Sequence, residues 1–116
     1  MISELAIREI LALYRKHGWF LRSVLLSAEL KIALAENLES VFGKAEIFSS
    51  ELDALWFSRS SRPESEAWEI RYLNETPFAM VEVIDGDYSD GERDDVLKSA
   101  EMKMSEIVKS KKPSKF

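Results

Sequence analysis

Hydrophobic and polar residues alternate along three consecutive stretches in the middle of the chain, at 53–60, 66–73 and 78–85. A period of two is the pattern of a β-strand with one buried face, and aromatic and β-branched residues are frequent in all three stretches. Turn-forming residues separate them, and Pro63 and Pro77 interrupt the pattern because proline lacks a backbone N–H donor. The middle of the chain therefore predicts an antiparallel meander of three strands.

The register of this meander follows if both connections close symmetrically. Arg59 then pairs with Glu66, and Leu73 pairs with Phe78. Both pairings place the same apolar residues on one face, which we expect to be core: Leu55, Phe57, Trp68, Ile70, Tyr72, Ala79, Val81 and Val83. A shift of one residue would move every side chain to the other face, so the agreement between the two pairings supports this register.

The opposite face of the meander is mixed in character. Its members are Trp56, Ser58, Glu69, Arg71, Met80 and Glu82. One interpretation is a solvated face, because antiparallel sheets commonly expose one side to water. The other is a binding surface, since a tryptophan surrounded by Arg and Glu has the composition of an interface hot spot. We take these six residues as the candidate binding residues and expect Trp56 to lie outside, among charges.

The segments before the meander alternate between helical and extended patterns. A helix is predicted at 3–17, where apolar residues are so frequent that little of its surface is expected to face water. The stretch 19–26 is predicted to be a strand, although its aliphatic residues also suit a helix. A second helix is predicted at 28–42, and a short edge strand at 44–49.

The acidic loop 85–91 follows the meander and leads into a last helix at 92–109, which we expect Asp90 to cap. As an EF-hand, the loop would lack the required Gly and Glu, and a strand precedes it instead of a helix, so no calcium site is predicted. The basic segment 110–116 is predicted to be a disordered tail, and 1–109 a single globular domain.

Together these elements predict an α+β domain in the order α-β-α-β-β-β-β-α. We expect an antiparallel or mixed sheet of four to five strands, with the helices packed mainly on one face. The apolar face of the meander should meet the first and the last helix.

Composition narrows the chemistry available to the chain. Its 116 residues include no cysteine and one histidine, His17, so disulfides, thiol nucleophiles and thiolate metal sites are excluded. It has no glycine-rich phosphate loop and no recognisable catalytic motif, and no cofactor or metal is predicted. A net charge of −5 disfavours nucleic acid as the main partner. No stretch has the pattern of a membrane span or signal peptide, which favours a cytoplasmic location.

These observations favour a non-enzymatic protein-interaction module that self-associates or docks a protein partner through the mixed face of the meander. The alternative is a small-molecule-binding domain, or a weak carboxylate-dependent hydrolase, that uses the same face. Its basis is that Glu69 and Glu82 would lie opposite each other, and closely opposed carboxylates raise one pKa of the pair.

Overall fold

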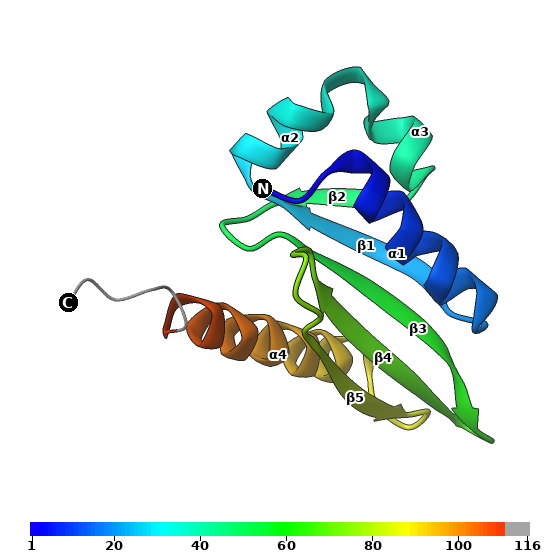
Figure 1. Cartoon of the computed structure of the whole chain (residues 1–116). Helices are drawn as coiled ribbons and strands as arrows, with labels where there is room; N and C mark the ends of the chain where they lie inside the picture. Colours follow the sequence, from blue (N-terminus) through cyan, green and yellow to red (C-terminus); the bar gives the residue numbers. More distant parts are fainter. Residues whose placement is uncertain (111–116) are drawn as a thin grey trace.

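The structure, a computed structural model, describes residues 1–110, and its elements follow the predicted order (Figure 1). The chain runs through α1 (Glu4–Lys16), β1 (Phe20–Leu26), α2 (Ala28–Leu34), the 3₁₀ turn η1 (Ala35–Asn37), α3 (Leu38–Phe42), β2 (Glu46–Ser49), β3 (Ala54–Arg62), β4 (Ser65–Tyr72), β5 (Ala79–Asp85) and α4 (Asp90–Ser110). The predicted α+β class is confirmed. The predicted tail, 110–116, lies outside the described residues except for Ser110, which ends α4.

The five strands form one mixed sheet in the order β2-β1-β3-β4-β5. β1 and β2 are parallel, and every other neighbouring pair is antiparallel. Parallel neighbours need a crossover connection, which the second helical segment, α2 through α3, supplies. The stretch 19–26 is therefore a strand, as predicted, and β2 lies at an edge of the sheet, as predicted.

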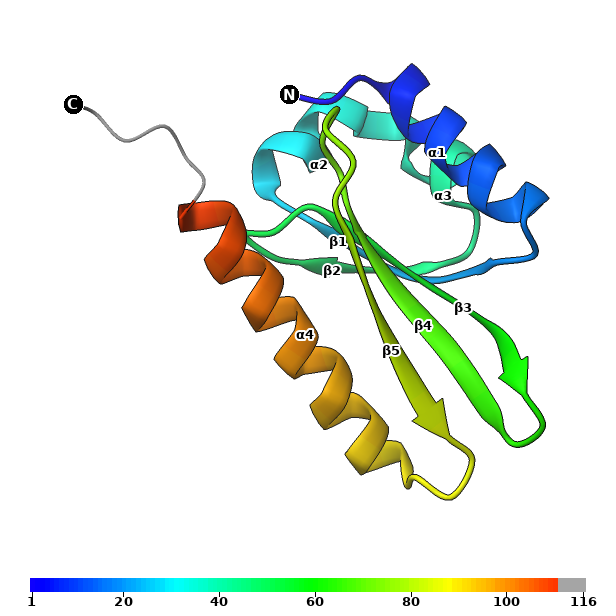
Figure 2. The ribbon, with the colours of Figure 1, turned by 60° about the horizontal axis from the view of Figure 1, so that its bottom comes forward.

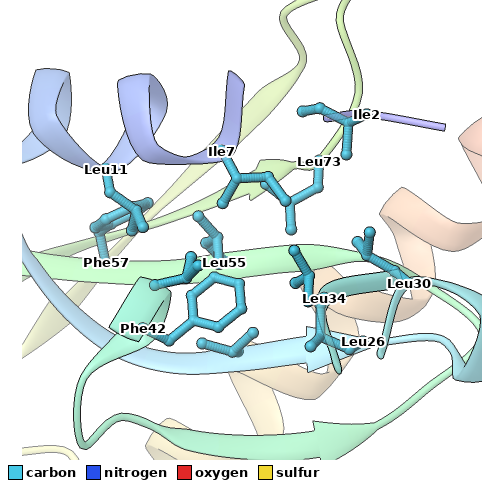
Figure 3. Packing of buried hydrophobic residues seen from close by; sticks show 12 residues of the cluster. Ile2, Ile7, Leu11, Leu26, Leu30, Leu34, Phe42, Leu55, Phe57 and Leu73 are labelled. Carbon is cyan, nitrogen blue, oxygen red and sulfur yellow. The ribbon is translucent and has the colours of Figure 1, made fainter. Parts of the chain in front are cut away.

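Helices cover both faces of the sheet (Figures 1 and 2). One face, called here the α1 face, packs against α1, α2 and α3, and its main buried residues point toward one another between these helices and the sheet (Figure 3): Ile7, Leu11, Leu26, Leu30, Leu34, Phe42, Leu55, Phe57 and Leu73. The other, called the α4 face, has a separate core beneath α4: Leu25, Leu52, Ala54, Trp56, Trp68, Ile70, Ile84, Ala100 and Met104. The expectation that the first and last helices share one face of the meander is therefore wrong.

The register of β4 differs by one residue from the predicted register on both of its sides. Trp56 lies opposite Ile70, and Trp68 lies opposite Glu82. The sequence had predicted Trp68 opposite Phe57 and Val83. Both shifts concern β4, so the side chains of this strand alone lie on the opposite face from the predicted one, and Trp68 and Ile70 face α4. The side chains of β3 and β5 that were predicted to share a face do share it.

A β-bulge explains the shift in the first hairpin. The pairing changes register between Ser60 and Arg62, which leaves Ser61 as an extra residue on β3. The turn that follows is tight, and Glu64 within it adopts a positive φ of 67°. The predicted hairpin had no such extra residue, so its pairing of β3 with β4 differs by one residue from the observed pairing.

The second hairpin closes at Tyr72 and not at Leu73. The Tyr72 N–H donates to the Phe78 carbonyl at 2.9 Å, and the Leu73 N–H donates at 2.9 Å to the carbonyl of Asp53. The side chain of Leu73 is buried in the α1-face core. Leu73 therefore leaves the ladder to fill a different part of the molecule, and the expected symmetric closure fails.

The first two helical segments differ in detail from the prediction. Ser3 caps α1 by accepting a hydrogen bond from the Ala6 N–H at 3.1 Å. However, Leu5 and Leu13 on this helix are 69% and 54% exposed, so α1 is not buried nearly all round. The predicted helix at 28–42 is interrupted at Ala35, where φ is 48°, a value outside the right-handed helical region.

The last helix begins with a reciprocal cap that the sequence analysis missed. The Glu92 N–H donates to the Ser89 hydroxyl at 3.1 Å, and the Ser89 N–H donates to the Glu92 carboxylate at 2.8 Å. Ser89, and not Asp90, is therefore the capping residue. Among residues 1–110, no helix combines the length and apolar character needed to cross a membrane.

Candidate functional site

The structure places Trp56 in the α4-face core. Its side chain is 2% exposed and packs edge-on against Trp68, with ring centroids 6.2 Å apart. The indole N–H donates to the Glu101 carboxylate of α4 at 2.7 Å. Burial of the ring is favourable because this bond satisfies its only polar atom. The prediction of an exposed indole is wrong, and Trp56 instead fastens α4 to the sheet.

Ser58 is also buried on the α4 face, where it has a structural partner. Its hydroxyl accepts a hydrogen bond from Arg22 of β1 at 3.1 Å. The same guanidinium lies 4.7 Å from the centroid of the Trp68 ring, and that of Arg93 from α4 lies 5.7 Å from it. Two cation–π contacts, one from the sheet and one from α4, therefore engage the tryptophan ring. Ser58 is thus engaged within the fold and does not form part of an open surface.

Glu69 and Arg71 lie on the opposite, α1 face of the sheet. Glu69 pairs with Val81 and not with Glu82, so the two glutamates occupy different faces. The close pair of carboxylates on which the hydrolase alternative depended is therefore not formed. Arg71 is buried, and its guanidinium donates to two backbone carbonyls at and just after the end of β4.

Tyr14 of α1 is the partner of Glu69. Its hydroxyl donates to the Glu69 carboxylate, and its ring stacks on Phe57 with centroids 4.0 Å apart. Burial and, second, this hydrogen bond raise the pKa of Tyr14 above its ordinary value of 10.0, because both disfavour the phenolate. The contact ties α1 to β4 across the α1 face.

Met80 and Glu82, the last two predicted site residues, lie half-buried on the α4 face of β5. Four of the six predicted residues therefore share the α4 face, and two lie on the other. The residues of β5 on the α1 face behave differently: Val81 is 53% exposed and Val83 45%. They were predicted to be core, but the buried α1-face cluster among residues 1–110 contains no residue of β5.

The hydrogen bonds of β5 show which of its backbone groups lack a strand partner. At one end Tyr72 donates to Phe78, and at the other Gly86 donates to Glu64. Bonded and non-bonded pairs alternate along an antiparallel ladder, so the even-numbered residues of β5 direct their N–H and C=O groups at β4. The backbone groups that point away from the sheet belong to the odd-numbered residues, and because the Asp85 carbonyl already accepts a hydrogen bond from the Tyr88 N–H, three of them keep both groups open: Ala79, Val81 and Val83.

These three residues, Ala79, Val81 and Val83, are called here the β5 edge. Each presents an exposed apolar side chain on the α1 face and outward-directed backbone groups on the same strand. The other edge of the sheet is protected by its shortness, since β2 has four residues against seven in β5. Sequence reasoning missed the β5 edge because apolar residues lie on both faces of the strand, so its pattern did not show which face the helices leave uncovered.

A hollow of about 550 Å³ lies on the α4 face, between α4 and strands β1 and β2. Its lining includes Phe48 and the edges of Trp56 and Trp68, together with charges of both signs: Arg22, Glu46, Arg93, Asp94, Asp95, Lys98 and Glu101. This mixture of charges selects no single class of ligand. Within residues 1–110, no group of three or more His, Cys, Asp or Glu side chains is placed to hold a metal ion.

Comparison of the chain with models of protein families, with curated proteins and with solved structures found no match. The β5 edge is the candidate site, because it combines exposed apolar side chains with backbone groups that have no strand partner within the described part of the chain.

Replacing Trp56 with alanine should lower the free energy of unfolding by about 3–5 kcal/mol, because it empties a buried site and leaves Glu101 without its donor. Phe20→Ala is the control, since Phe20 is 70% exposed, and it should cost less than about 1 kcal/mol. Urea unfolding followed by circular dichroism measures both. Equal, small losses for the two variants would contradict the buried position of Trp56.

The Tyr14–Glu69 contact should make stability depend on pH in the alkaline range. The unfolded chain loses the Tyr14 proton near its ordinary pKa of about 10, whereas the folded chain retains it. The contribution of this contact is therefore complete below about pH 10 and is lost as the pH rises through the raised pKa of the folded state. The difference in urea midpoint between wild type and Tyr14→Phe should shrink from about pH 9 to about pH 11. A constant difference would show that Tyr14 titrates normally.

Proposed function

We propose that this protein is a non-enzymatic interaction module that self-associates through the β5 edge, acting as a cytoplasmic homodimer. The observation that carries the proposal is the coincidence on Ala79, Val81 and Val83 of outward-directed backbone groups and uncovered apolar side chains. Strand addition to an open sheet edge uses both, since backbone hydrogen bonds provide affinity and alternate side chains provide specificity.

The β5 edge has few of the features that keep ordinary edge strands from pairing, because β5 is not short and contains no lysine and no proline. Proteins protect such edges with short strands, lysine, proline or inward-pointing charges. Of the outward-facing residues of β5, Ala79, Val81 and Val83 are uncharged and Asp85, at the end of the strand, is the one charge; Glu82 points to the α4 face. An exposed seven-residue strand of this kind is expected to pair with another polypeptide.

A second copy of this chain is the partner that fits the edge best. The edge is apolar and uncharged, so it favours an equally apolar strand over a charged one. β5 of another copy is such a strand, and it brings its own outward-directed N–H and C=O groups. Pairing two copies therefore satisfies the open groups of both and covers the valines of both at once.

Val81→Lys should abolish self-association without unfolding the protein. The substitution places a charge at the centre of the β5 edge, where the side chain of Val81 is 53% exposed and makes no core contact that its loss would disrupt. Sedimentation equilibrium should show the average mass of the wild type rising toward two chains with concentration, while the variant stays at one chain.

Leu5→Lys is the matched control, because Leu5 is 69% exposed on α1, away from the β5 edge. This variant should associate as the wild type does. A wild type that remains one chain up to about 1 mM would refute the proposed function. If both lysine variants lose association equally, the interface is not specific to β5 and the proposed location is wrong.

A further inference from the structure

We infer that two copies pair along β5 as antiparallel strands related by a two-fold axis that passes beside Val81. This inference rests on the proposed self-association and specifies its geometry. It would join two sheets of five strands edge to edge into one continuous sheet. Three features select this register: the direction of the free backbone groups, the charge of Glu82 and the position of Pro77.

The direction of the backbone groups restricts the register. Only odd-numbered residues of β5 point their N–H and C=O groups outward, so an odd residue must face an odd residue of the partner. With two-fold symmetry, the registers that overlap the centre of the strand are three. The axis passes beside Met80, beside Val81 or beside Glu82.

The register centred on Glu82 brings like charges together. It places Glu82 directly opposite the partner's Glu82 in a non-hydrogen-bonded pair, in which the Cα atoms lie about 4.5 Å apart. Like charges in this position are destabilising, the more so for a carboxylate that is half-buried. This register would also pair Asp85 with the partner's Ala79. The Asp85 carbonyl, however, already accepts a hydrogen bond from the Tyr88 N–H at 3.1 Å.

The register centred on Met80 leaves one end of the β5 edge without complete backbone pairing. It places Val83 opposite the partner's Pro77, and proline has no N–H to donate. Only the two pairs between Ala79 and the partner's Val81 then form complete hydrogen-bonded rings.

The register centred on Val81 avoids both defects. Val81 faces the partner's Val81, and Ala79 faces the partner's Val83 on either side of the axis. All three residues of the β5 edge are then fully paired, and the proline lies just beyond the last complete pair. On the α4 face, Glu82 lies opposite the partner's Met80, so no like charges are opposed.

Mixing variants of opposite charge tests this register. Val81→Lys and Val81→Glu should each be monomeric alone, because each places like charges across the two-fold axis. An equimolar mixture of the two should associate about tenfold more tightly than either alone, since Lys then faces Glu. Sedimentation velocity at matched total concentration measures the dimer fraction in each sample.

Two further mixtures distinguish the competing registers. Val81→Lys mixed with Val83→Glu is rescued only if the axis lies beside Glu82, and Val81→Lys mixed with Ala79→Glu only if it lies beside Met80. Rescue of either mixture in place of the first overturns the inferred register but leaves the proposed self-association standing. If the wild type associates but no mixture is rescued, the antiparallel β5 pairing is wrong. If the wild type is monomeric, the proposed self-association is itself refuted.

Discussion

The pairing of β4 with its two neighbours decides which side chains each layer of helices can bury. In the observed register Trp68 and Ile70 face α4, while Glu69 and Arg71 face the α1 side. A shift of one residue would place both charges beneath α4 and remove both large apolar side chains from its core. The two charged residues instead find polar partners: the Tyr14 hydroxyl for Glu69, and backbone carbonyls for Arg71. The bulge at Ser61 and the departure of Leu73 from the ladder hold this register at either end of β4.

The same pairing links the core of the molecule to its proposed working surface. Once Ile70 pairs with Met80, the alternation of hydrogen bonds directs the backbone groups of Val81 and Val83 outward and their side chains to the α1 face. The buried clusters show why this end of that face stays open: α1, α2 and α3 pack over residues of β1 and β3, while α4 covers β5 from the other side. The exposure of this edge therefore follows from the position of β5 at the end of the sheet and from how far the helices of the α1 face reach across it.

Local patterns were sufficient to predict the order of the elements, the strand at β1 and the edge position of β2. Each depends on residues that are near one another in the chain. The faces of β4 could not be predicted in the same way. The alternation of apolar and polar residues shows which face of a strand is buried only when the other face is exposed. Helices cover both faces of β4, so apolar residues on either face support two registers equally. Trp56 was misplaced for this reason. It shares a face with Trp68 and not with the charges of Glu69 and Arg71.

The candidate site depended on tertiary information that no local pattern contains. Val81 and Val83 read as core residues in sequence because their exposure depends on how far α1 reaches across the sheet. Of the six residues first proposed, Met80 and Glu82 lie on β5 itself, but on the face turned toward α4. The proposed interaction surface is therefore the edge of the strand, and not the face on which the six residues were predicted to lie.

Amide hydrogen exchange along β5, measured by NMR in dilute and in concentrated solution, tests the central claim most directly. In dilute solution the amides of Met80, Glu82 and Ile84 should exchange slowly, and those of Ala79, Val81 and Val83 rapidly. In concentrated solution the second set should become protected as well, while the first set stays slow. Rapid exchange at Met80, Glu82 and Ile84 in dilute solution, or no gain in protection at Val81 on concentration, would contradict the account.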